Sequence, residues 1–256
     1  MMRQTLKSFR RASLWLAGTF AAFTLAACDD ATPDYRYRLT VEVESPEGLR
    51  SGSGVIEVEQ SMGRSSMNPA SSQIYRRTRG EAVAVDLPGG QTLFALLRSE
   101  SNIEWAETIA ASVAPPAEES EDGEPRFDNM LALEGAAELP RTFPASGWLE
   151  ERSAYPMLVT FGDIDDPSSV REVDPDDLAA TFGAGYALER ITVEITDDRV
   201  TTGIEERLGW WSRIEDSGGG LIPMVRNDSG RWEAAPGFDE GLVDVGLSSF
   251  STEAFE

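Results

Sequence analysis

The chain has 256 residues, of which 22 are basic and 45 acidic, and it contains no histidine and one cysteine. The formal net charge of −23 predicts repulsion from nucleic acid and from anionic lipid headgroups, so no nucleic-acid partner is expected. The length allows one large domain or two small ones.

The residue types that are absent exclude most catalytic chemistry. Histidine is absent, Lys7 is the only lysine and Cys28 is the only cysteine. Beyond residue 28 this excludes Ser-His-Asp triads, Cys-His pairs, Ser-Lys dyads, Schiff-base lysines and zinc sites built on His or Cys. Carboxylate acid/base catalysis and hard metal ions with oxygen ligands remain. These missing residue types favour a protein that is not an enzyme, and no cofactor is predicted.

The first 27 residues have the features of a bacterial lipoprotein signal peptide. A basic start is followed by an apolar run over residues 14–25, and Leu25-Ala26-Ala27 leads to Cys28. The basic residues are Arg3, Lys7, Arg10 and Arg11. We predict cleavage before Cys28 and lipidation of its thiol and amine, with palmitate or similar chains holding the protein on the membrane.

Two other interpretations of this segment are weaker. The apolar run is short for a membrane-spanning helix, which needs about 20 residues. An ordinary secretory signal would leave the Cys28 thiol unpaired in an oxidising compartment. Localisation in the cell envelope, facing the periplasm, is therefore expected. Asp29 resembles an inner-membrane retention signal and slightly favours the inner over the outer membrane.

Cleavage would leave 229 residues with 18 arginines and 45 acids, a formal charge of −27. Such a charge predicts that membrane association comes from the lipid at Cys28 and not from a basic face. Residues 28–35 are expected to form a tether between the lipid and the folded part.

Period-two alternation predicts strands in the N-terminal half, residues 36–116. The expected strands are 37–44, 54–60, 83–87 and 93–97. Residues 61–79 are polar and are expected to form an excursion between strands. Hairpin connections between these strands predict an antiparallel sheet, packed as a sandwich or roll. A helix is expected over 103–113, with Asn102 as its N-cap.

Residues 117–125 form an acidic loop in this interpretation, and residues 126–256 form a mixed strand-helix half. Asp174 is expected to cap a helix that ends near Phe182, and the tail 237–256 is expected on the surface. The predicted strands of this half are 157–161, 168–173, 188–196 and 221–225. The fold class is therefore a β-rich α+β protein, with the two halves packed as one unit.

The sequence Asp163-Ile164-Asp165-Asp166 is a weak candidate for a metal site, since clustered carboxylates can share a hard cation. An EF-hand requires Gly and Glu where this chain has Ser168 and Asp174. A surface Asx-turn explains the aspartates better, so no metal is predicted.

Three other groups have both a functional and a structural interpretation. Arginines 76, 77 and 79 could bind an anion but more simply offset nearby acids. Tryptophans 210, 211 and 232 could line a glycan or peptide groove, although tryptophans are mostly buried. Aspartates 174, 176 and 177 are best explained as helix-start residues.

Several stretches resemble an uncharacterised family of proteobacterial lipoproteins and secreted hypothetical proteins. The resemblance rests on residues 159–170 (VTFGDIDDPSSV), 173–183, 190–196 and 201–208, and segments 37–58 and 83–98 are similar to the same family. It covers most of the chain after Cys28. The family has no assigned activity, so the resemblance implies no functional residue.

The sequence therefore favours a lipid-anchored envelope protein that acts as a non-enzymatic binding or envelope-assembly factor, with an unknown protein or glycan partner. The alternative is a carboxylate-based hydrolase of cell-wall or glycan substrates. That alternative requires two facing carboxyl groups, one with a raised pKa, in a tryptophan-lined cleft.

Overall fold

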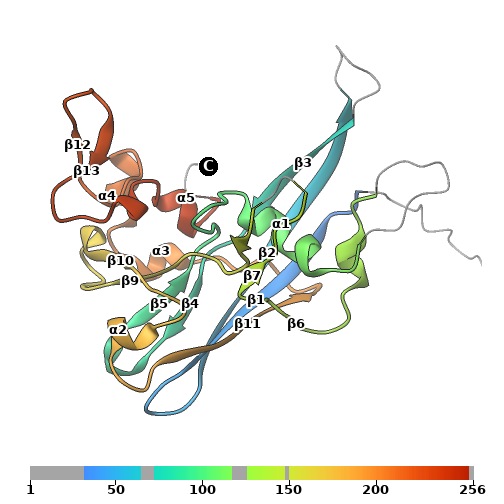
Figure 1. Ribbon diagram of the computed structural model, residues 1–256, viewed down its shortest axis with the longest axis horizontal. Coiled ribbons are helices and arrows are strands. Elements are labelled where there is room, and N and C mark those ends of the chain that lie inside the picture. Colours follow the sequence, from blue (N-terminus) through green and yellow to red (C-terminus); the bar gives the residue numbers. More distant parts are fainter. Residues whose placement is uncertain (1–31, 65–71, 117–125, 148–149, 254–256) are drawn as a thin grey trace, which may run out of the picture.

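A computed structural model of the protein describes residues 32–64, 72–116, 126–147 and 150–253. It confirms the predicted fold class, because 36% of the structure is strand and 20% is helix, with antiparallel sheets (Figure 1). Cys28 and the acidic loop 117–125 lie outside the described residues.

The larger sheet has five strands in the order β3-β2-β1-β11-β6. Their bounds are β1 Tyr35–Glu44, β2 Arg50–Arg64, β3 Ser72–Arg79, β6 Ala137–Glu138 and β11 Ala187–Ile195. The alternation that predicted β1 is visible in its burial, with Tyr37, Leu39 and Val41 buried and the residues between them partly exposed.

The predicted excursion over residues 61–79 is wrong in part. β2 continues to Arg64, and β3 runs back from Ser72 to Arg79 in antiparallel pairing with it. The polar side chains misled the prediction, because both faces of this hairpin are at least partly exposed and need no apolar alternation. β2 and β3 extend together from one end of the sheet (Figure 1).

The second sheet has four strands in the order β10-β9-β5-β4. Their bounds are β4 Val83–Asp86, β5 Thr92–Ala95, β9 Leu158–Phe161 and β10 Val170–Glu172. β4 crosses β2 at very short range, since a Cβ on Gly52 would lie 2.1 Å from the Ala84 carbonyl oxygen. A glycine at position 52 is thus required for the two sheets to approach there.

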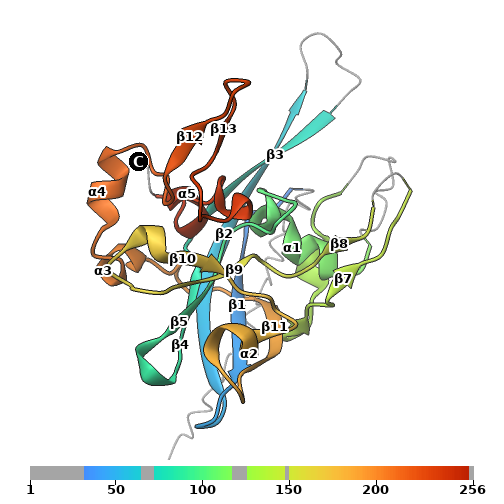
Figure 2. The ribbon, with the colours of Figure 1, turned by 60° about the vertical axis from the view of Figure 1, so that its left-hand side comes forward.

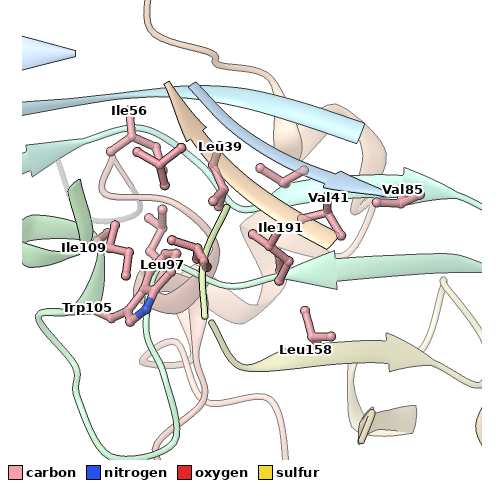
Figure 3. Packing of buried hydrophobic residues seen from close by; sticks show 14 of the residues in the cluster. Leu39, Val41, Ile56, Val85, Leu97, Trp105, Ile109, Leu158 and Ile191 are labelled. Carbon is pink, nitrogen blue, oxygen red and sulfur yellow. The ribbon is translucent and has the colours of Figure 1, made fainter. Parts of the chain in front are cut away.

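The four-stranded sheet is buried on both faces and forms the middle layer of the molecule. Leu93 and Ala95 point toward the five-stranded sheet, whereas Phe94 and Leu96 point into a second core on the other side. Figure 3 shows the first core, where Leu39, Val41 and Ile191 face Leu158. Trp105 and Ile109 lie at the side of the same core. Continuous apolar runs such as 93–97 are expected of strands buried on both faces.

α1 (Trp105–Val113) closes one end of the first core. Tyr37 donates a hydrogen bond through its hydroxyl to the Ala106 carbonyl oxygen, 2.8 Å away. Asn102 is not the N-cap residue; its side-chain oxygen accepts the Glu104 N–H, one step before the helix begins at Trp105. The helix therefore begins two residues later than predicted.

The second core is closed by the C-terminal part of the chain, which corrects the predicted surface location of the tail. Phe250 is fully buried, and its ring lies 5.7 Å from that of Phe94 and 6.0 Å from that of Phe161. The helices of this layer are α3 Ile204–Arg207, α4 Trp211–Asp216 and α5 Leu247–Phe250. Figure 2 shows α3, α4 and α5 grouped on one side of β9 and β10.

The remaining elements are short. α2 covers Leu178–Phe182 and is capped by Asp177, whose carboxylate accepts the Ala180 N–H, so the predicted cap at Asp174 is wrong by three residues. The small hairpins are β7–β8 (Thr142–Phe143, Arg152–Ser153) and β12–β13 (Met224–Arg226, Trp232–Ala234). The 3-10 turns are η1 Pro88–Gly90, η2 Asn129–Ala132, η3 Pro167–Ser169 and η4 Glu240–Leu242.

Candidate functional site

The tether predicted to lead from Cys28 enters the fold at a well-held point. The side-chain amide of Gln60 donates to the Pro33 carbonyl oxygen at 2.8 Å, and its backbone N–H donates to the Asp34 carboxylate at 2.7 Å. Gln60 is itself buried, at 8% exposure. The start of β1 is therefore fixed to β2, at the end of the sheet from which β2 and β3 extend.

The weak metal candidate is a turn in the structure. Asp163 accepts the Asp165 N–H at 3.0 Å, and Asp166 accepts both the N–H and the hydroxyl of Ser168 at 3.0 and 2.7 Å. These are Asx-turns, the structural interpretation that the sequence favoured. Among the described residues, His, Cys, Asp and Glu side chains form no group of three that could hold a metal ion.

The aspartates at the start of α2 also have local roles. Asp174 accepts the Asp176 N–H at 2.8 Å, and Asp177 caps the helix. Asp176 pairs with Arg141, whose hydrogen bond lowers the pKa of that carboxyl. The arrangement matches their prediction as helix-start residues, although the cap is Asp177.

The structure brings together one carboxyl pair that the sequence did not reveal. Glu172 on β10 and Glu100, which lies between β5 and α1, have side chains close enough to interact. Burial is the main cause that raises the pKa of Glu172 to about 7, and Glu100, Asp239 and Asp174 raise it further. Glu172 therefore keeps its proton to a higher pH than an ordinary glutamate does.

Two open hollows flank this pair. One, of about 520 Å³, is lined on the Glu172 side by Ser168, Ser169, Arg171, Phe238 and Asp239, among others. The other, of about 330 Å³, is lined on the Glu100 side by Arg141, Glu151, Arg152, Ser153 and Asp176, among others. Among the described residues that line the two hollows there is no tryptophan. Glu172 thus has a raised pKa, but the described lining lacks the tryptophans expected of the predicted hydrolase.

Glu81 is a second carboxyl group with a raised pKa. It is 5% exposed, and its two oxygens accept the N–H groups of Gly203 and Ile204 at 2.9 and 3.0 Å. Burial raises its pKa to about 7, although both hydrogen bonds act in the opposite direction. Since both oxygens are bonded to the start of α3, Glu81 holds the fold together at this point.

The tryptophans divide between core and surface. Trp210 and Trp211 belong to the second core, and the Trp210 indole N–H donates to the Ile164 carbonyl oxygen at 2.8 Å. Trp232 on β13 is 55% exposed, and the Arg226 guanidinium lies 4.9 Å from the centre of its ring. They do not line a common groove, because two of the three are packed in the core.

The β12–β13 hairpin that carries Trp232 is internally rigid. The Asn227 side-chain oxygen accepts the N–H groups of Ser229 and Arg231 at 3.1 and 3.0 Å and closes the turn. An open hollow of about 720 Å³ lies beside the hairpin. Its lining comprises Asn227, Gly230, Arg231, Trp232, Glu233, Glu240, Val243 and Asp244.

The arginines 76, 77 and 79 do not converge on a common pocket. Arg79 pairs with Glu57 at 3.5 Å, and Arg76 donates to the Gln60 side chain at 3.2 Å on the other face of β3. On the open face of the five-stranded sheet, Glu57 also pairs with Arg36 at 2.6 Å. Arg79 and Arg36 thus offset an acid, as the simpler interpretation held.

Comparisons with protein-family models, curated proteins and solved structures find no match for this chain. The resemblance to a family of proteobacterial lipoproteins therefore stays a prediction. Within the described ranges, the helices are too short or too polar to cross a bilayer.

Proposed function

We propose that this protein is a lipid-anchored protein of the bacterial cell envelope that acts by binding a partner, without catalysis. The proposal joins the lipoprotein signal that ends at Cys28 with the lack of histidine, and of lysine after residue 7. The observation that carries the binding role is the β12–β13 hairpin, where an exposed Trp232 lies against Arg226.

Tryptophan and arginine are enriched among the residues that contribute most to binding, because each offers a large contact area and a directed polar group. Burial of half-exposed Trp232 by a partner would remove apolar area from water, and a rigid turn lowers the entropy lost on binding. Val225, 37% exposed on β12, is paired with Glu233 and lies on the other face of the hairpin, so Trp232 and Arg226 form the proposed binding face. The partner would be a protein or a glycan.

The anchor is tested by labelling cells with radioactive palmitate. The parent chain is expected to incorporate the label and to sediment with membranes, whereas the Cys28→Ser variant does neither. Equal behaviour of the two chains would remove the anchor from the proposal.

The binding role is tested in living cells with a photoreactive amino acid at Ser229. This residue lies in the hairpin turn, three residues before Trp232. We expect a discrete adduct that disappears when Trp232 is also changed to Ala. The matched control places the same amino acid at Ile103, which is 73% exposed but lies outside the hairpin. Adducts of equal yield from both positions, or persistence in the Trp232→Ala background, would contradict a binding role for the hairpin.

The second candidate function, a carboxylate-based hydrolase, is favoured by one observation, the interacting Glu100–Glu172 pair. Glu172, with its pKa raised to about 7, would act as the general acid, and Glu100 as the base or nucleophile. Incubation of isolated cell-wall sacculi with the protein tests this role. Release of soluble fragments that is lost in Glu172→Gln but retained in Glu189→Gln, which changes an exposed glutamate on β11 that lines neither hollow, would favour the hydrolase over the binding protein.

A further inference from the structure

β2 and β3 form an arm that extends past the rest of the five-stranded sheet. The first residue of β1, Tyr35, pairs with Val58 on β2, and β2 then continues for six residues to Arg64. At about 3.3 Å per residue this continuation is about 20 Å long. We call residues 59–64 and 72–77, which pair with each other, the arm.

The arm and the chain that comes from Cys28 leave the body at the same end. Because β1 and β2 are antiparallel, the N-terminal end of β1 and the C-terminal end of β2 lie together. Gln60 at the base of the arm holds both Pro33 and Asp34. Figure 1 shows the arm extending from the side of the molecule at which β1 begins.

The length of the tether decides where the arm can lie. Five residue steps separate Cys28 from Pro33, and a fully extended chain spans at most about 3.6 Å per residue, which limits this distance to about 18 Å. The arm, at about 20 Å, is at least as long as the fully extended tether. A bilayer that holds Cys28 is therefore within reach of the arm.

The charge of the arm differs from that of the chain. The arm contains one acid, Glu59, and three arginines at positions 64, 76 and 77, a net charge of +2, in a chain of −23. The tether is acidic at Asp29, Asp30 and Asp34, so attraction to an anionic surface would have to come from the arm. Charges are screened within about 8 Å in physiological salt, so the arm responds to a nearby surface independently of the distant acids.

The side chains of the arm also suit the headgroup region of a bilayer. Tyr75 is 55% exposed and lies across Gly63, where a Cβ would meet its ring at 2.5 Å. On the same face, Arg77 is exposed and stands opposite Glu59 in the register. The opposite face carries the partly exposed pair Met62 and Ile74. Amphipathic tyrosine and arginine with apolar neighbours favour the interface between water and lipid.

We propose that the arm docks on the anionic phospholipid headgroups of the bilayer that holds Cys28, and so sets the orientation of the body relative to the membrane. The inference rests on the proposed lipid anchor. It revises the expectation that the lipid alone mediates membrane contact.

The test uses the lipidated full chain, reconstituted into phosphatidylcholine vesicles with and without phosphatidylglycerol. Gln73→Cys places an environment-sensitive dye on the exposed face of the arm, beside Tyr75. Glu47→Cys places it in the turn at the other end of β1 and β2, about 43 Å away along the strands, because Gln73 pairs with Gly63, far along β2 from Arg50. With brominated lipids, we expect quenching at position 73 and none at position 47.

The charge contribution is tested in the same vesicles. Arg77→Gln is expected to lower the ratio of lipid-contacting to free arms about five-fold, since each basic residue near an anionic surface contributes at that level. Arg213→Gln on α4 is the matched control, because it removes an exposed arginine far from the arm. The control is expected to leave the ratio unchanged.

The outcomes separate the two proposals. If the protein floats with the vesicles but position 73 is quenched no more than position 47, the docking of the arm is overturned and the anchor stands. The docking is also overturned if quenching at position 73 is the same with and without phosphatidylglycerol and is unchanged by Arg77→Gln, because the tether alone would then explain the quenching. If the parent fails to float, as Cys28→Ser should, the anchor and the docking are both overturned.

Discussion

The side chains of Glu172 and Glu100 lie close enough to interact, although the two residues are 72 positions apart in the chain. Two carboxyl groups in such contact cannot both be ionised without mutual repulsion, and burial of Glu172 adds to this cost. The pair therefore links the stability of this edge of the four-stranded sheet to pH.

The first prediction is a pH-dependent effect of Glu172→Gln. The pKa of Glu172 is about 7 in the folded chain and near 4.5 when unfolded, so the folded chain holds the proton more tightly. The stabilisation of the folded chain by the proton on Glu172 is complete below about pH 4.5 and is lost as the pH rises through 7. Glutamine resembles the protonated form, so the variant is expected to gain in unfolding free energy relative to the parent as the pH rises. Urea denaturation at a series of pH values measures this gain.

Glu151→Gln is the control for this measurement, since Glu151 is an exposed carboxylate beside the hollow on the Glu100 side. It removes one negative charge without entering the pair. A gain of the same size and pH dependence in this control would show that overall charge, and not the pair, is responsible.

The second prediction concerns Glu81. Glu81→Ala leaves the N–H groups of Gly203 and Ile204 without their acceptors, so we expect a loss of about 1–3 kcal/mol in unfolding free energy. Glu205→Ala removes an exposed acid from the first turn of the same helix and should change stability by less than about 0.5 kcal/mol. Chemical denaturation compares the two; equal losses would mean that Glu81 does not hold α3.

The third prediction tests the close approach of the two sheets. Gly52→Ala introduces a Cβ that would lie 2.1 Å from the backbone oxygen of Ala84, so one of the strands must shift. Overpacking of this kind costs about 1–3 kcal/mol, measurable by thermal or urea unfolding. At Gly209 a Cβ would meet no atom within 4 Å, and Gly209→Ala should be tolerated. If the two variants unfold alike, the strands are less closely packed than described.

The fourth prediction tests whether the C-terminal tail belongs to the core. Phe250→Ala removes a fully buried ring that contacts Phe94 and Phe161, and we expect a loss of about 3–5 kcal/mol. Leu131→Ala, at a side chain that is 51% exposed, should cost much less. Similar unfolding midpoints for the two variants would show that the tail is not part of the core.

The local sequence pattern was sufficient to predict a strand wherever one face of that strand is buried and the other is not. β1 and β11 alternate between buried and more exposed residues, and both were predicted from that alternation within two residues of their bounds. The turns at Asp163 and Asp166 were also predicted, because an aspartate side chain bonds to backbone only two residues away. Both features depend on neighbours in the chain.

The strand-rich class, most strand positions and the few chemistries open to a chain without histidine could be predicted from the sequence. Three contacts are visible only in the folded chain: β3 lies along β2, Phe250 packs in the core, and Glu100 lies next to Glu172. These contacts join residues far apart in sequence, and their free energy comes from burial and pairing that exist only when the sheets are packed. No local periodicity encodes them.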